Sequence, residues 1–183
     1  MRGVPTPFEG VTFSKVRPTP GNRVALERAT AFLDGTRDLY LAGPVGTGKT
    51  MLACAIGNEI ARTARRDVLF VRWPLALRRL QPGPSDEETR NQLEDDLCSV
   101  PLLILDDLGA ERNEATDFTR RTALLVYESR GDAGLRTIVT SNLSLDELAQ
   151  HQGDDRLASR IAGRADVVRV DGADQRLRKL RAV

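Results

Sequence analysis

The sequence predicts a three-layer α/β fold, in which a parallel β-sheet is covered by helices on both faces. Short apolar runs such as Val68-Leu69-Phe70-Val71 and Leu102-Leu103-Ile104-Leu105 are typical of strands that are buried on both faces. These runs alternate along the chain with longer helix-like stretches, which favours strand–helix–strand units with right-handed crossovers. The length of 183 residues suits one domain with a substantial core, so we expect residues 1–183 to form a single domain.

Composition excludes several classes of protein. Lys and Arg number 27 and Asp and Glu number 26, so there is no globally basic surface for nucleic acid, and any such contact needs a local patch. Cys54 and Cys98 lie far apart in apolar contexts, which predicts buried thiols in a reducing compartment and no metal site of their own. The sequence contains no apolar run approaching roughly 18 residues and no signal-peptide core, so we expect a cytoplasmic protein without a membrane partner.

Residues 1–21 carry prolines at positions 5, 7, 18 and 20, a pattern that predicts an extended arm with little regular structure. Residues 22–33 follow with the apolar spacing of a helix, including Val24 and Leu26, and Asn22 stands where an N-cap is expected. The first strand, the helix after a glycine-rich loop and the second strand are predicted over 38–42, 51–63 and 67–73.

Residues 73–96 form a predicted helical insertion between the second and third strands. A short helix comes first, the chain breaks at Pro82-Gly83-Pro84, and a second helix starts at Ser85, with Glu88 completing a capping box. The later strands are predicted over 101–105, 135–140 and 167–170. The later helices are predicted over 116–130 (with Phe118, Leu125 and Val126 on one side), 144–150 and 155–162. A basic C-terminal tail is expected over 172–183.

The glycine-rich loop is Gly43-Pro44-Val45-Gly46-Thr47-Gly48-Lys49-Thr50, which fits the phosphate-loop pattern G-x-x-x-x-G-K-[ST] at every defined position. Its glycines let backbone N–H groups wrap around phosphates, and the helix that opens at Met51 presents its positive end to the same anion. We therefore expect residues 43–51 to bind ATP, with Lys49 reaching the β- and γ-phosphates and the Thr50 hydroxyl ligating Mg²⁺. A glycine-rich turn that binds no ligand is the alternative, and the flanking strand and helix count against it.

The third predicted strand ends in two carboxylates, Asp106 and Asp107. Polar side chains at the carboxyl end of a buried parallel strand face the crevice in which such folds bind ligands. We expect Asp106 to hold Mg²⁺, directly or through water, and Asp107 to polarise the water that attacks the γ-phosphate. An exposed Asp-Asp turn is the alternative, which the phosphate loop upstream disfavours.

Two further polar groups follow the fourth predicted strand. Asn142 ends that strand and could orient water beside the γ-phosphate, although an Asn in this place is also a common turn residue. Arg156 and Arg160 are four residues apart and so share one helix face. They either form a solvated face, paired locally with Asp154 or Asp155, or meet the γ-phosphate of a neighbouring subunit.

The order of these motifs resembles that of the AAA+ ATPases, and more closely that of DnaC-type helicase loaders and IstB-type transposition ATPases. The resemblance is carried by the phosphate loop, by Leu-Leu-Ile-Leu-Asp-Asp-Leu-Gly at 102–109, by Thr-Ser-Asn-Leu at 140–143 and by the arginines within 156–160. It covers residues 13–176 and implies an AAA+ core with a five-stranded parallel sheet in the order 5-1-4-3-2 and a reduced or absent lid.

The resemblance also implies a role for each matching residue. Walker A is represented by Lys49 and Thr50, Walker B by Asp106 and Asp107, sensor 1 by Asn142, and the arginine finger by Arg160 with Arg156 beside it. Arg176 falls where a sensor 2 arginine stands in relatives, with an ordinary residue of the basic tail as the alternative. Phe13 and Asn22 fall where family members approach the adenine base.

In loaders and initiators of this type, extra helices at this place touch single-stranded DNA, so the resemblance implies such a contact for residues 73–96. The basic residues available for it are Arg72, Arg78, Arg79 and Arg90, and Trp73 is a candidate stacking group. Acidic residues outnumber basic ones in the insertion, so such contact would use its first helix only. A solvated amphipathic hairpin with Trp73 in the core is the alternative.

Taken as a whole, the resemblance implies a homo-oligomer, a ring or a helical filament, that loads a replicative helicase onto single-stranded DNA during replication. Helicase loaders normally carry an additional N-terminal domain that grips the helicase, whereas only 42 residues precede Gly43 here. How a helicase is gripped therefore stays open. The alternatives are an IstB-type ATPase that regulates a transposase on duplex DNA, and a truncated nucleotide-binding core.

Overall fold

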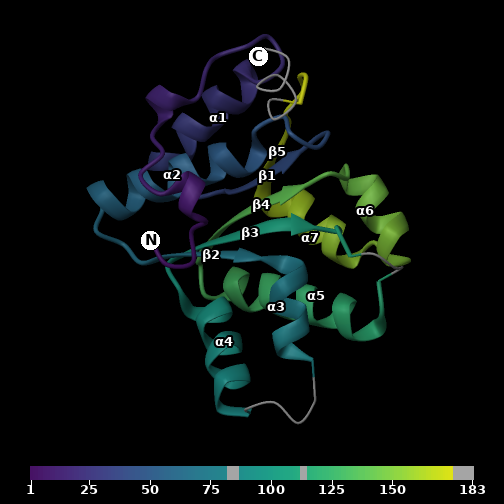
Figure 1. Cartoon of the computed structure of the whole chain (residues 1–183). Coiled ribbons are helices and arrows are strands. Elements are labelled where there is room, and N and C mark those ends of the chain that lie inside the picture. Colours follow the sequence, from purple (N-terminus) through teal and green to yellow (C-terminus); the bar gives the residue numbers. More distant parts are fainter. Residues whose placement is uncertain (82–86, 112–114, 175–183) are drawn as a thin grey trace.

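A β-sheet lies at the centre of the molecule, and the helices pack around it (Figure 1). The computed structural model describes residues 1–81, 87–111 and 115–174. Its five strands pair in the order β2-β3-β4-β1-β5, and every neighbouring pair is parallel. The strands are β1 (Asp38–Ala42), β2 (Val68–Arg72), β3 (Leu102–Leu108), β4 (Arg136–Ser141) and β5 (Ala165–Arg169). The order 5-1-4-3-2 implied by the family resemblance is therefore confirmed.

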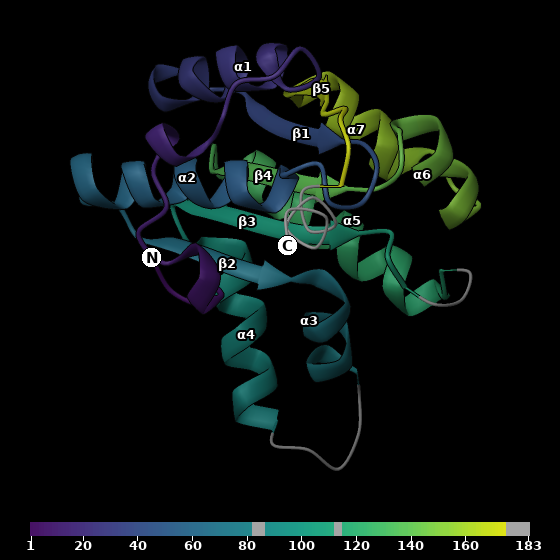
Figure 2. The same cartoon turned by 45° about the horizontal axis from the view of Figure 1, so that its top comes forward.

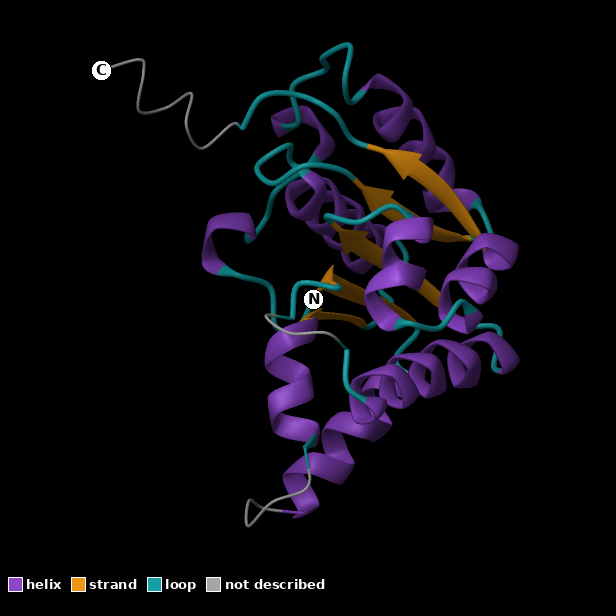
Figure 3. Ribbon diagram, turned by 90° about the vertical axis from the view of Figure 1, so that its right-hand side faces the viewer, coloured by secondary structure: helices purple, strands orange, loops and turns teal. Residues whose placement is uncertain are grey.

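Helices cover both faces of this sheet, so the three-layer arrangement is also confirmed (Figure 3). One face is covered by α1 (Arg23–Asp34) and α2 (Lys49–Thr63), whose apolar side chains enclose one hydrophobic core. A second core lies on the opposite face. Its helices are α3 (Trp73–Leu80), α4 (Glu87–Ser99), α5 (Asp117–Asp132), α6 (Leu145–Gln152) and α7 (Arg156–Arg164).

The N-terminal arm runs along the outside of the α2 layer. It carries two short 3₁₀ helices, η1 (Thr6–Phe8) and η2 (Phe13–Lys15), and Arg2 pairs with Leu69 at the edge of the sheet. Asn22 occupies the N-cap position of α1, but its side chain does not cap the helix. Its amide instead accepts a hydrogen bond from Thr19 N (2.7 Å) and donates one to Arg17 O (2.9 Å), so it shapes the loop before the helix.

Several sequence expectations differ from the structure. Leu125 is 49% exposed, because α5 turns a different stripe toward the core, which includes Ala123, Val126 and Tyr127. Val24 on α1 is likewise exposed, and Cys98 is only partly buried. The predicted capping box at Ser85 lies outside the described residues. A capping box is present at the start of α6, where Ser144 and Glu147 exchange hydrogen bonds with each other's backbone.

A polar cluster is buried at the amino ends of β1 and β4. The Asp38 carboxylate is 3% exposed and accepts hydrogen bonds from Tyr127 Oη and Thr137 N, each over 2.7 Å, while Arg164 Nη2 lies 3.1 Å away. Burial is the main cause of the raised pKa of Asp38, and the Arg164 charge opposes it. Gly131 makes this arrangement possible, because a Cβ atom there would lie 2.1 Å from Arg164 Nη1.

All strands point the same way, so their carboxyl ends meet at one edge of the sheet (Figure 2). The phosphate loop follows β1, the two carboxylates lie within β3, Asn142 follows β4, and residues 170–174 follow β5. This edge is the place where parallel α/β sheets bind their ligands. Within the described residues, none of the helices combines the length and the apolar character that crossing a membrane requires.

Candidate nucleotide-binding site

The phosphate loop adopts a backbone conformation that its glycines permit. Gly43, Gly46 and Gly48 have φ angles of 142°, 78° and 101°, which other residues rarely adopt. Space is equally restricted, because a Cβ atom at Gly43 would lie 2.2 Å from Val170 O, and one at Gly46 would lie 2.1 Å from the carboxylate of Asp174. The loop is thus folded tightly against the segment that follows β5, and Gly48 leads directly into α2.

Lys49 joins the phosphate loop to the end of β4. Its Nζ donates hydrogen bonds to Gly43 O (2.6 Å), Pro44 O (2.8 Å) and Asn142 Oδ1 (2.9 Å). The side chain is only 5% exposed, so the ammonium group is held by these oxygens rather than by bulk water. The structure therefore brings together two of the predicted site residues, Lys49 at the start of α2 and Asn142 just after β4.

Thr50 and Asp106 form a second polar pair beneath the loop. Asp106 Oδ1 accepts a hydrogen bond from Thr50 Oγ1 and another from Thr140 Oγ1, each over 2.8 Å. Asp106 is 2% exposed, and this burial raises the pKa of its carboxyl while the two hydroxyl groups oppose the shift. A hydroxyl oxygen beside a carboxylate is a set of hard oxygen donors, so these residues fit Mg²⁺.

Thr140 is a further site residue, to which the sequence motif at 140–143 had assigned no role of its own. Its hydroxyl donates to Asp106 Oδ1 and accepts a hydrogen bond from Asp107 N over 3.1 Å, so it fixes both carboxylate residues. Asp107 has a φ of 62°, a left-handed conformation that is unusual for a residue with a side chain. The signal that could have revealed Thr140 is its hydroxyl in the otherwise apolar run Ile138-Val139-Thr140.

Of these groups, Lys49, Thr50, Asp107 and Asn142 line a cavity of about 1350 Å³, while Asp106 and Thr140 lie beneath it and are not among the described lining residues. The phosphate loop, Asp107 and Asn142 form one side of it, and Phe8, Lys15 and residues 17–21 of the arm form another. Residues 171–173 complete the wall, where Asp171 N donates to Gly21 O over 2.8 Å. This volume accommodates a ligand the size of a nucleotide.

The arm contributes different residues from those that the family resemblance implied. Both Phe8 and Phe13 pack against the core under α1 and α2, and of the two, Phe8 alone is among the described residues that line the cavity. Asn22 is not among the described residues that line the cavity. Its amide forms hydrogen bonds with Arg17 and Thr19, which do line it, so Asn22 acts on the site indirectly. Nothing in the sequence of the arm distinguishes Phe8 from Phe13, since the path of the arm depends on contacts with α2.

The two arginines of α7 lie on the surface. Arg156 pairs with Asp154 (2.6 Å) and Arg160 pairs with Glu128 of α5 (2.9 Å), and their side chains are 65% and 63% exposed. Neither is among the described residues that line the cavity of its own chain. Arg176 lies outside the described residues.

The helical insertion exposes most of its predicted basic residues, but its predicted stacking residue is buried. Trp73, the first residue of α3, is 0% exposed, so its interpretation as a base-stacking residue is wrong and its alternative placement in the core is confirmed. Arg72, Arg78 and Arg79 are exposed, while Arg90 lies 3.6 Å from Glu87 within α4.

Comparisons with known proteins place this geometry in a wider group. A family described as IstB-like ATP binding protein matches residues 5–182. The replicative helicase loader DnaI of Bacillus subtilis (strain 168) is 32% identical over 186 residues, which cover 91% of this chain and 58% of that protein. A putative insertion sequence ATP-binding protein, y4pL of Sinorhizobium fredii (strain NBRC 101917 / NGR234), is 33% identical over 151 residues, covering 81% of this chain and 59% of that protein. The chain thus spans less than two thirds of both relatives.

Solved structures agree in fold. A crystal structure of DnaI superposes with a TM-score of 0.80 at 30% identity, covering 92% of this chain and 95% of that one. The AMPPCP-bound DnaA of Aquifex aeolicus gives a TM-score of 0.74 at 23% identity, covering 94% of this chain and 54% of that one. The second likeness is one of fold alone.

Proposed function

The chain belongs to the IstB-like ATP-binding protein family, and we propose that it hydrolyses ATP with Mg²⁺ in order to load a replicative helicase onto single-stranded DNA. It is an ATP-binding AAA+ protein of the DnaI/DnaC or IstB type. The observation that carries the proposal is the meeting of Lys49 with Asn142, and of Thr50 with Asp106, at one edge of the sheet. This is the arrangement that phosphoryl transfer from a nucleotide needs.

Each residue has a task that follows from its position. The backbone N–H groups of the phosphate loop and the Lys49 ammonium hold the phosphates, while Thr50 and Asp106 hold Mg²⁺. Mg²⁺ bound there neutralises the charge that develops on the phosphate oxygens. Asp107 orients the attacking water and accepts its proton, and Asn142 orients the same water or the γ-phosphate.

Assembly supplies the remaining charge. Arg160 is exposed on α7 and does not line the described cavity of its own chain, so we assign it to the γ-phosphate of a neighbouring subunit. An arginine at that place stabilises the transition state, which makes hydrolysis slow in the monomer and faster in the assembly. Repeated head-to-tail contacts of this kind build a ring or a helical filament.

Two observations point to different partners. The DnaI relative supports helicase loading, and the exposed Arg72, Arg78 and Arg79 on and beside α3 provide a local basic surface for single-stranded DNA. The family description and the insertion sequence relative support the second candidate, an ATPase that regulates a transposase on duplex DNA. A nucleotide-binding core that assembles with neither partner is the third.

The deciding experiment measures the ATPase rate per subunit as a function of protein concentration, with no DNA, single-stranded DNA or duplex DNA. We expect the rate to climb with concentration and with single-stranded DNA, and to collapse in Arg160→Ala while ATP binding persists. Arg121→Ala, which removes an exposed arginine from α5, is the matched control. Stimulation by duplex DNA alone would favour the transposase regulator, and a rate indifferent to DNA and to Arg160 would leave the nucleotide-binding core.

A further inference from the structure

Asn58 connects the N-terminal arm to the helix that begins at the phosphate loop. It lies on α2, and its Nδ2 donates hydrogen bonds to Phe8 O over 3.1 Å and to Val11 O over 3.0 Å. These two bonds use both amide hydrogens, so the orientation of the side chain is fixed. Because Asn58 and Lys49 belong to one continuous helix, the bonds also fix the turn at 8–11 relative to the phosphate loop.

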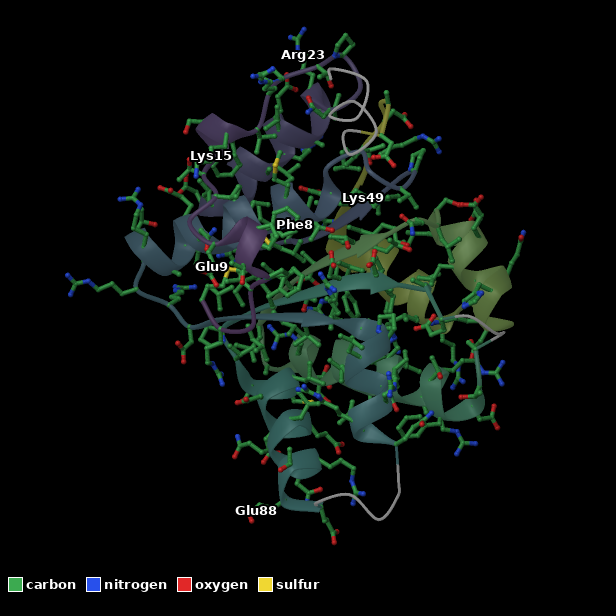
Figure 4. All side chains as sticks on the ribbon, viewed as in Figure 1. Phe8, Glu9, Lys15, Arg23, Lys49 and Glu88 are labelled. Atoms are coloured by element: carbon green, nitrogen blue, oxygen red, sulfur yellow. The ribbon has the colours of Figure 1, made fainter. Side chains whose placement is uncertain are left out.

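The turn at 8–11 positions the side chain of Phe8, which lines the cavity. It is the one aromatic side chain among the described residues that line the cavity, and Met51 is one of several further apolar side chains in the lining. Figure 4 shows Phe8 in the same region of the molecule as Lys49, with Lys15 farther along the arm. Aromatic side chains bind nucleobases by stacking, which requires a flat apolar surface and little else. The phosphates belong at Lys49, so the arm side of the cavity remains for the base.

We propose that Phe8 contacts the base of the bound nucleotide and that Asn58 is the positioning residue that sets Phe8 in place from outside the cavity. This rests on the proposed binding of ATP at the same cavity and adds the recognition of its base. Asn58 is not among the described residues that line the cavity, so its effect on binding passes through the arm. The arm is therefore part of the nucleotide site. Helix α2 connects the part of the site that binds the base with the part that binds the phosphates.

The test compares two probes by titration calorimetry: ATP, and inorganic tripolyphosphate, which lacks both the base and the ribose. Phe8→Ala removes the ring, Asn58→Asp replaces the amide donors by a carboxylate that faces two carbonyls, and Asn58→Ala removes the donors without adding charge. We expect each to weaken ATP binding roughly tenfold and tripolyphosphate binding less than about twofold. Phe8→Tyr keeps the ring and should bind ATP like the wild type. Asn91→Asp, the same change at an exposed position on α4, should alter neither.

A double variant separates positioning from a merely structural role. If Asn58 acts through Phe8, then Phe8→Ala combined with Asn58→Ala should bind ATP no more weakly than Phe8→Ala alone. Additive losses, equal losses of both probes, or full ATP affinity in Phe8→Ala would each overturn the proposal. Thermal unfolding of every variant identifies any variant that does not fold. If the Asn58 variants fail to fold, Phe8→Ala still decides whether the base lies at Phe8, because that change leaves the bonds from Asn58 to the backbone carbonyls intact. Failure of the wild type to bind either probe would contradict the proposed function instead.

Discussion

Lys49 and Asn142 are joined by a hydrogen bond of 2.9 Å, which ties the phosphate loop to the end of β4 across the cavity. The same ammonium group is the one that we assign to the β- and γ-phosphates. A bound triphosphate thus competes with Asn142 and with two loop carbonyls for Lys49. Binding of ATP should therefore release the Asn142 amide, which becomes available to the γ-phosphate or to water.

Removing that amide should separate hydrolysis from binding. We expect Asn142→Ala to bind ATP within about threefold of the wild type, because Lys49 keeps its carbonyl contacts, and to hydrolyse it at least about tenfold more slowly. Lys49→Ala should lose binding itself, by roughly tenfold to a hundredfold, since it removes a charged donor to phosphate. Binding by calorimetry and single-turnover hydrolysis make the comparison, with Asn91→Ala as the control. Equal loss of binding in both variants would contradict it.

Glu128 should restrain Arg160, the proposed arginine finger. In the free chain Arg160 pairs with Glu128 over 2.9 Å, and an exposed pair of this kind contributes about 0–1 kcal/mol. Glu128→Gln should therefore lower the protein concentration needed for half-maximal ATPase activity, by up to about fivefold, and most strongly at low salt. Glu27→Gln, which breaks the exposed Arg23–Glu27 pair on α1, should leave that concentration unchanged. A higher concentration requirement in Glu128→Gln would show that Glu128 supports the assembly.

Asp174 should oppose nucleotide binding. Its carboxylate lies against Gly46, in the loop whose N–H groups are expected to bind phosphate. The negative charges of the carboxylate and of the phosphate repel each other. We expect Asp174→Asn to bind ATP a few-fold more tightly, with the difference shrinking as salt is added. Asp132→Asn, an exposed change at the end of α5, is the control for net charge. Weaker ATP binding in Asp174→Asn would mean that this carboxylate contributes to the site.

Asp106 should make the stability of the nucleotide-free protein depend on pH. Burial raises the pKa of its carboxyl above the ordinary 3.8, so folding favours the protonated form. The penalty for ionising it is absent below pH 3.8 and grows as pH rises through the raised pKa. Asp106→Asn should accordingly raise the melting temperature near pH 7, and by less at acidic pH, while it abolishes Mg²⁺-dependent hydrolysis. A variant that melts lower at pH 7 would contradict this reasoning.

Gly131 should tolerate no side chain, although it lies in a helix. Replacing a helical glycine by alanine ordinarily stabilises by about 1 kcal/mol. A Cβ atom at Gly131 would displace the Arg164 guanidinium, which then has to leave the buried Asp38 carboxylate, and Arg130 is the other cation whose charge acts on that carboxylate. We expect Gly131→Ala to destabilise by about 2 kcal/mol or more in urea unfolding. Gly163→Ala, where an added Cβ would meet none of the described atoms within 4 Å, should be neutral or stabilising.

The sequence predicted the parts of the site that short motifs encode. The phosphate loop, Asp106, Asp107 and Asn142 follow strands whose apolar character is plain, and parallel strands bring such ends to one edge. Phe8, Asn58 and Thr140 could not be predicted in the same way. Each acts through a contact between segments that are far apart in the chain, such as Asn58 with Phe8 and Thr140 with Asp106. No local pattern records the first contact, and a single hydroxyl in an apolar run is the one local sign of the second.

The same limit explains the misplaced core residues. Leu125 and Trp73 are both large apolar residues in amphipathic stretches, yet the first is exposed and the second is fully buried. The exposure of each residue depends on which face of its helix, α5 or α3, is turned toward the sheet. The rotation of α5 is fixed in part by Arg130 and Tyr127, which satisfy buried polar groups of the neighbouring strands.

The hydrogen bond from Asp171 N to Gly21 O has a consequence for how the protein is made. The ribosome completes the Walker A, Walker B and sensor segments before it reaches residue 171. A growing chain therefore holds every catalytic motif while one wall of its nucleotide cavity is still missing. Tight capture of ATP should begin only when residues 171–173 have emerged and met the arm, so nucleotide binding would follow the emergence of that segment.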